Sequence, residues 1–104
     1  MESLIFLVVG KNMPILEAVK RGIERDSNWF AYITNELKDF YQLVLTKNID
    51  AVMLSSGLDS KSEEEIKKFI HCNLPNIKVI EHYGGGFGLI RSEVLQAFPY
   101  LIAN

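Results

Sequence analysis

The chain has 104 residues, enough for one small domain with a hydrophobic core and too few for two, so we expect residues 1–104 to form a single domain. Its composition, 48% hydrophobic and 23% charged, is that of an ordinary soluble globular protein. A formal net charge of -2 gives no general attraction to nucleic acid or to an anionic membrane, and neither is an expected partner.

The first apolar segment, Leu4–Val9, is too short to span a membrane and follows Glu2 without a basic flank. It therefore predicts a buried strand rather than a signal peptide, and a cytoplasmic protein. Unbroken apolar character is typical of a strand covered on both faces in a parallel sheet. A helix should follow, with Asn12 as its N-cap and Pro14 in its first turn. Its expected buried face is Ile15, Ala18, Val19, Gly22 and Ile23.

Two further strand and helix units follow. The aromatic run Trp29–Ile33 predicts the second strand, and Ala51–Leu54 the third. The third helix is expected to open with a capping box formed by Ser62 and Glu65, and to end at Pro75. Helical spacing marks the buried positions of these two helices as Leu37, Phe40, Tyr41, Val44 and Leu45, then Ile66, Phe69, Ile70 and Leu74.

A fourth strand over residues 77–81 leads into a glycine run, and a last helix is expected to end at Pro99. The tail, residues 100–103, fits either a short fifth strand or an extension of that helix. Regular alternation of strands and helices predicts an α/β three-layer sandwich. This fold has a parallel sheet of four or five strands with helices on both faces.

Ligands of open parallel sheets bind at the carboxyl ends of the strands. Here a lysine, two serines and a glycine loop that opens a helix could hold a small anion through a positive charge and backbone N–H groups. The residues of this candidate site are Lys11, Ser55, Ser56, Gly84, Gly85, Gly86 and Gly88. The loop matches neither GxGxxG nor GxxxxGKS, and we favour the interpretation of a purely structural loop that needs positive φ angles.

The order of elements resembles the receiver domain of response regulators over residues 3–98. That family has a flavodoxin-like fold with strand order 2-1-3-4-5. An acidic pair follows its first strand, the phosphoaccepting aspartate its third, a hydroxyl residue its fourth and a lysine its fifth. Here Gly10 and Lys11 replace the acidic pair, Ser55 replaces the phosphoacceptor and Tyr83 lies near the hydroxyl position. The lysine has no clear counterpart.

Phosphoryl transfer to a carboxylate needs Mg²⁺ held by oxygen ligands. Gly10, Lys11 and Ser55 offer no carboxylate, and Lys11 would repel the ion. Asp59 is more readily explained as a surface turn residue than as a substitute ligand, and Asp50 lies at the wrong end of its strand. The resemblance therefore implies a receiver-like module without phosphotransfer, catalytic residues, metal or cofactor.

A second resemblance is to cobalamin-binding domains of the same fold. Ser56-Gly57-Leu58 matches their Ser-x-Leu motif after strand three, and Gly84-Gly85 matches their Gly-Gly motif after strand four. Both motifs are short, and the loop after strand one lacks the histidine that ligates cobalt. This argues against cobalamin as a cofactor.

The leading interpretation is a non-enzymatic protein-interaction or regulatory module, and the alternative is the anion-binding module described above. An aromatic second strand at one sheet edge, and a fourth strand left at the other edge if no fifth forms, predict self-association as a homodimer. His82, with no acid at evident spacing, gives little support for catalysis. Cys72, the single cysteine, is expected to be a passive helix residue.

Overall fold

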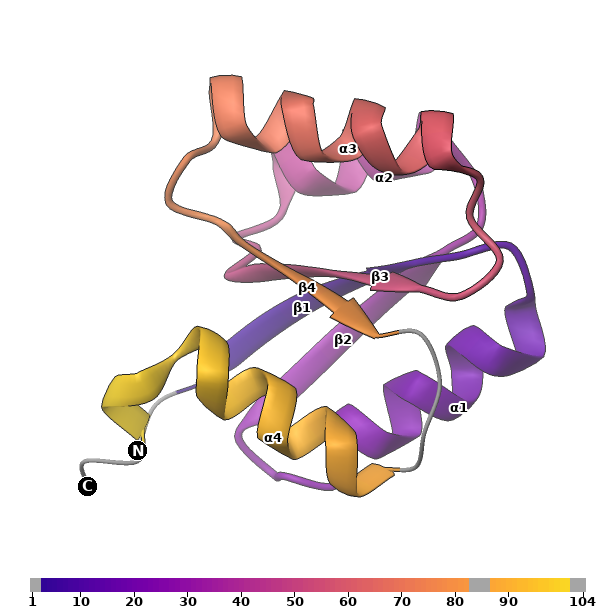
Figure 1. The fold of residues 1–104 in the computed structure, drawn as a ribbon. Coiled ribbons are helices and arrows are strands. Elements are labelled where there is room, and N and C mark those ends of the chain that lie inside the picture. Colours follow the sequence, from indigo (N-terminus) through magenta and orange to yellow (C-terminus); the bar gives the residue numbers. More distant parts are fainter. Residues whose placement is uncertain (1–2, 83–86, 102–104) are drawn as a thin grey trace.

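The computed structural model describes residues 3–82 and 87–101, in which strands and helices alternate along the chain (Figure 1). Each predicted strand is present, with bounds that differ by at most one residue. The strands are β1 (Leu4–Val9), β2 (Trp29–Thr34), β3 (Ala51–Ser55) and β4 (Lys78–His82). The helices are α1 (Met13–Ile23), α2 (Leu37–Thr46), α3 (Ser60–Asn73) and α4 (Phe87–Ala97), followed by a 3-10 turn at Pro99–Leu101.

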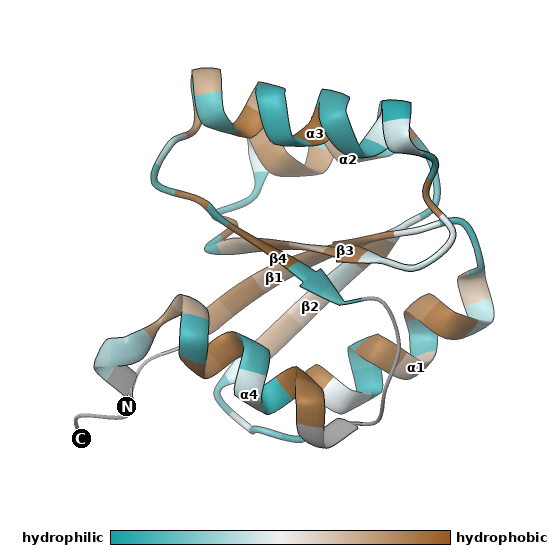
Figure 2. Cartoon of the chain, in the orientation of Figure 1, coloured by the Kyte–Doolittle hydropathy of each residue, from teal (hydrophilic) through white to brown (hydrophobic). Residues whose placement is uncertain are grey.

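The described strands form one parallel sheet in the order β2-β1-β3-β4. Helices α2 and α3 cover one face, and α1 and α4 cover the other (Figure 1). Figure 2 shows apolar residues of β1 and β3 between the helix layers and hydrophilic residues along α3. The three-layer sandwich is therefore present, with the continuously apolar β1 at its centre as predicted.

The position of α4 bears on whether a fifth strand follows β4 in the sheet. The crossover from β3 to β4 passes through α3, and a right-handed crossover to a strand beyond β4 would need its helix on the α3 face. Helix α4 instead packs on the opposite face with α1. In the described part of the tail, Tyr100 belongs to the 3-10 turn and not to a strand. Residues 102 and 103 lie outside the described residues. Within the described chain, β2 and β4 are the two edges of the sheet.

Some buried positions were assigned wrongly from the helical spacing. Ile15 is 42% exposed and Leu45 is 62% exposed, whereas Leu16 is fully buried. Neighbouring apolar residues such as Ile15 and Leu16 fit the helical period almost equally well. Packing against the sheet determines which of them is buried.

The start of α3 also differs from the prediction. Asp59 is the N-cap, and its side chain accepts a hydrogen bond of 2.7 Å from the Ser62 amide. The expected capping box of Ser62 and Glu65 is therefore wrong, because the helix begins at Ser60 and both residues lie inside it. The first helix does begin at its predicted cap, where Asn12 accepts from the Ile15 amide at 3.2 Å.

Candidate functional site

The register of the sheet gathers the ends of its strands in one row. Val9 lies beside Leu54, and Ser55 lies beside His82. Gly10 therefore follows β1 at the level where β3 and β4 end. The loops proposed as a site from the sequence do begin along one edge of the molecule, as parallel topology requires.

Gly10 and Ser55 pack closely in this row. A Cβ atom on Gly10 would lie 3.0 Å from the Cβ of Ser55 and 2.9 Å from the Cδ2 of Leu16. Both neighbours are buried, with Leu16 fully buried and Ser55 1% exposed. A side chain at position 10 would require the surrounding core to move.

Lys11 lies beside the turn that follows β3. Its Cβ and Cγ atoms lie 3.5 and 3.9 Å from the place where a Cβ on Gly57 would sit. Gly57 has a φ of 97°, a conformation that glycine adopts without strain. The backbone bond from Ser62, supplemented by the positive charge of Lys11, lowers the pKa of Asp59 below its ordinary value of 3.8. The charges of Lys11 and Lys61 therefore both act on Asp59.

The described members of the predicted anion site lie at one end of the sheet but differ in accessibility. Lys11 is exposed, Ser56 is partly buried and Ser55 is buried. The predicted glycine ligands Gly84, Gly85 and Gly86 lie outside the described residues. Gly88 lies in α4, and its surroundings are not among those described.

His82 has an acidic partner that sequence spacing did not reveal. Its Nδ1 lies 2.6 Å from Oε1 of Glu93, which belongs to α4. The His82 residue is 5% exposed, while the Glu93 side chain is 25% exposed. His82 and the neighbouring Ser55 are buried, whereas Glu93 is partly exposed. The contact ties β4 to α4.

Asp50 occupies the opposite end of the sheet, as the sequence indicated. Its Oδ2 accepts a hydrogen bond of 2.8 Å from the Ile5 amide, and its own amide donates to the Ile5 carbonyl at 2.8 Å. Asp50 therefore aligns β1 with the start of β3. Asp59, as the N-cap of α3, is likewise explained by local structure.

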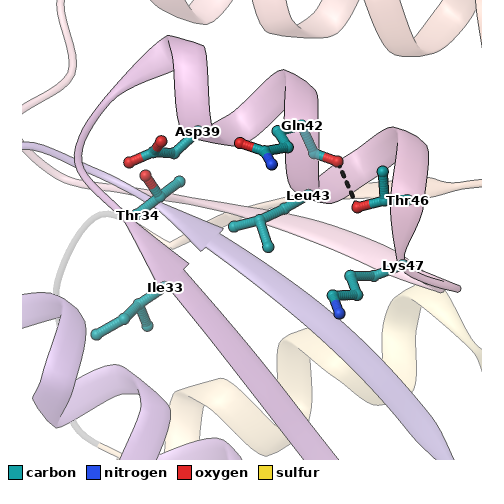
Figure 3. Close-up of a pocket in the computed structure, with 7 residues that line it drawn as sticks. All are labelled: Ile33, Thr34, Asp39, Gln42, Leu43, Thr46 and Lys47. Carbon is teal, nitrogen blue, oxygen red and sulfur yellow. Dashed lines mark hydrogen bonds between the residues drawn. The ribbon is translucent and has the colours of Figure 1, made fainter.

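Two open pockets lie on either side of the edge strand β2 and share Ile33. The first, of about 450 Å³, is surrounded by residues of β2 and α2 and by Lys47 (Figure 3). Thr34, Asp39, Gln42 and Thr46 give it a polar wall. The second, of about 540 Å³, lies between α1 and β2. Neither pocket is lined by the residues proposed from the sequence.

The described residues contain no group of three or more histidine, cysteine or acidic side chains placed to hold a metal ion. In the same part of the chain, no helix is long and apolar enough to cross a membrane. Cys72 is exposed on α3 rather than packed as a small apolar side chain.

Two solved structures of response regulators are similar to this chain. HP1043, an orphan response regulator of H. pylori, matches 91% of this chain with 76% of its own, at a TM-score of 0.64 and 19% identity. A response regulator from Thermotoga maritima matches 91% of this chain with 79% of its own, at a TM-score of 0.69 and 18% identity. No protein family and no curated protein matches the sequence. The likeness confirms the receiver-like, flavodoxin-like fold expected from the sequence.

Proposed function

We propose that the chain is a receiver-like protein-interaction or regulatory module that does not accept a phosphoryl group. The observation that carries this proposal is the packing of Gly10 on Ser55. In the receiver pattern, acidic residues occupy the place of Gly10 and Lys11, and the phosphoacceptor occupies the place of Ser55. A side chain at position 10 would have to displace Leu16 and Ser55, so the packing opposes a carboxylate there.

The chemistry of the neighbouring groups supports the same conclusion. A Mg²⁺ ion that neutralises a transferring phosphoryl group needs carboxylate oxygens. The nearby acid, Asp59, is engaged with the Ser62 amide, and Lys11 brings a positive charge to the same turn. Because Gly10, Lys11 and Ser55 supply no carboxylate at the positions of the receiver's acidic site, we propose that the module acts through protein contacts and not as an enzyme. We place this role in a cytoplasmic signalling or regulatory complex.

Phosphorylation provides the direct test. The chain is incubated with Mg²⁺ and acetyl phosphate, and separately with Mg²⁺ and beryllofluoride, beside an active receiver domain as a positive control. Mass spectrometry should detect no acid-labile phosphate, and amide NMR should show no saturable shifts around Ser55. A stoichiometric phosphate, or magnesium-dependent shifts centred on Ser55, would contradict the proposal.

Anion binding remains the second candidate, with Lys11, Ser55, Ser56 and the glycine loop as its residues. The acidic neighbour Asp59 weakens it, because it reduces the positive field at Lys11. A thermal-shift titration with inorganic phosphate tests it, since a ligand that prefers the folded state raises the unfolding temperature. If this site binds phosphate, Lys11→Ala should weaken binding by about tenfold. If phosphate raises the unfolding temperature of Lys11→Ala as much as that of the unmodified chain, or raises neither, Lys11 is excluded as a ligand.

A further inference from the structure

The outer edge of β2 can be located from its backbone hydrogen bonds. Leu4 and Gly10 donate to the carbonyls of Asn28 and Thr34, at 3.1 and 3.3 Å. Even-numbered residues of this strand therefore direct their backbone groups towards β1. Because these directions alternate along a strand, the odd-numbered residues direct theirs away from the sheet. Ala31 lies at the middle of that outer row.

Lys20 of α1 and Glu24, the C-cap residue of that helix, bind both outward backbone groups of Ala31. Lys20 Nζ donates to the Ala31 carbonyl at 2.5 Å, and Glu24 Oε2 accepts from the Ala31 amide at 3.0 Å. The two side chains also form an ion pair of 2.7 Å. We call this pair the edge clamp. It supplies one donor and one acceptor, as a neighbouring strand would.

Lys20 of the clamp also contacts an aromatic side chain of β2. Lys20 Nζ lies 4.4 Å from the centroid of the Phe30 ring, within the range of a cation–π contact. Phe30 is 45% exposed, and its ring contacts Tyr32 edge to face at 4.9 Å between centroids. The clamp therefore covers the backbone groups of Ala31, next to the apolar and partly exposed side chain of Phe30.

The sequence of β2 is nearly symmetric about Ala31. An aromatic residue lies on each side of it, Phe30 and Tyr32, and a large apolar residue follows in each direction, Trp29 and Ile33. If two copies paired antiparallel about Ala31, Phe30 of each would lie opposite Tyr32 of the other. Aromatic pairs directly opposite each other stabilise antiparallel strands.

We propose that the edge clamp closes β2, and that opening the clamp allows two copies of this chain to join through antiparallel pairing of residues 29–33. The occupant is a second copy because the strand is complementary to itself. This inference extends the proposed interaction role by naming a partner. It also restricts the expected homodimerisation at this edge to a chain in which Lys20 and Glu24 have released Ala31.

Removing the clamp tests the proposal. The variant Lys20→Ala/Glu24→Ala keeps the net charge and places alanine, a good helix former, at position 20 of α1 and at its C-cap. Sedimentation velocity over a micromolar concentration series should show a twofold rise in mass, while the unmodified chain stays monomeric. The matched control is Glu17→Ala/Arg21→Ala, which removes an acid and a base with the same spacing from the same helix. The control should remain a monomer.

A third variant adds Phe30→Lys to the clamp deletion and should be monomeric, because a lysine on an edge opposes strand pairing. If the clamp deletion prevents folding, judged by circular dichroism, Lys20→Met alone is tested in the same way. A folded clamp variant that stays monomeric would overturn the proposal. So would a dimer that persists with Phe30→Lys, or an unmodified chain that already dimerises through Phe30. The phosphorylation test reads a different property, so the two proposals can fail separately.

Discussion

Gly10 and Ser55 meet with the backbone of one residue against the side chain of the other, so that a Cβ on Gly10 would lie 3.0 Å from that of Ser55. This contact joins the hydrophobic core to the part of the molecule that the proposed function concerns. It packs the ends of β1 and β3 together in the place where the receiver pattern has its acidic site. A side chain at position 10 would have to displace this packing.

Gly10→Ala tests this contact. The added methyl group meets Ser55 and the fully buried Leu16, and overpacking of this kind costs about 1–3 kcal/mol. The loss of backbone freedom in the unfolded chain offsets only about 0.4–1 kcal/mol of that cost. The midpoint of urea unfolding should therefore fall.

Asn35→Ala is the control for this substitution, since Asn35 is exposed in the loop that follows the neighbouring strand. We expect its unfolding free energy to change by less than about 0.5 kcal/mol. A Gly10→Ala variant as stable as the unmodified chain would show that the contact relaxes without cost, and would remove the steric argument against a side chain at this position.

Much of the fold could be predicted because local patterns determine it. The unbroken apolar run Leu4–Val9 requires cover on both faces, and it is the strand that both β2 and β3 flank. The side on which α4 packs could not be predicted in the same way. An apolar stripe shows that one face of a helix is buried, but not which face of the sheet it meets.

The candidate site was predicted only in part for a related reason. Topology places Lys11 and Ser55 at the same end of the sheet, but the close packing at Gly10 and the presence of Glu93 beside His82 depend on how separate segments pack together. The edge clamp left a weak signal in the sequence. Lys20 and Glu24 have the spacing of a helical ion pair, but that spacing does not reveal their contact with Ala31.

The buried contact between β4 and α4 leads to a second prediction. Glu93→Ala leaves His82 without its 2.6 Å partner, and an unsatisfied buried polar group costs about 1–3 kcal/mol. Chemical denaturation at neutral pH measures this loss. Gln96→Ala, at an exposed position of the same helix, is the control and should have little effect. Equal stability of the two variants would mean that the contact contributes nothing to holding α4.

The edge clamp should also make stability depend on acid. Burial opposes ionisation of Glu24, but hydrogen bonds from Lys20 and from the Ala31 amide outweigh it and lower the pKa of Glu24 below its ordinary value of 4.5. The stabilisation from Glu24 is therefore present above 4.5 and is lost as the pH falls through the lowered value. When the free energy of unfolding is measured with urea from neutral to acid pH, Glu24→Gln should lack this part of the pH dependence. Glu64→Gln, at an exposed acid of α3, is the control. Parallel curves for Glu24→Gln and the unmodified chain would contradict the assignment.

The contact between α2 and α3 should be visible at alkaline pH. Tyr41 donates a hydrogen bond of 2.5 Å to Oε2 of Glu65, and this bond, assisted by burial and the carboxylate charge, raises the pKa of Tyr41 to about 12. Since the value in the folded chain lies above the ordinary 10.0, the stabilisation is complete below 10.0 and is lost as the pH rises through about 12.

An ultraviolet titration of the four tyrosines should therefore contain a component near 12 that is absent from Tyr41→Phe. Glu65→Gln should move the same component towards lower pH, because it removes the carboxylate that disfavours tyrosinate and leaves the ring packing in place. Tyr100→Phe, outside α2 and α3, is the control and should retain the component. A high-pH component that survives Tyr41→Phe would place the perturbed hydroxyl elsewhere in the chain.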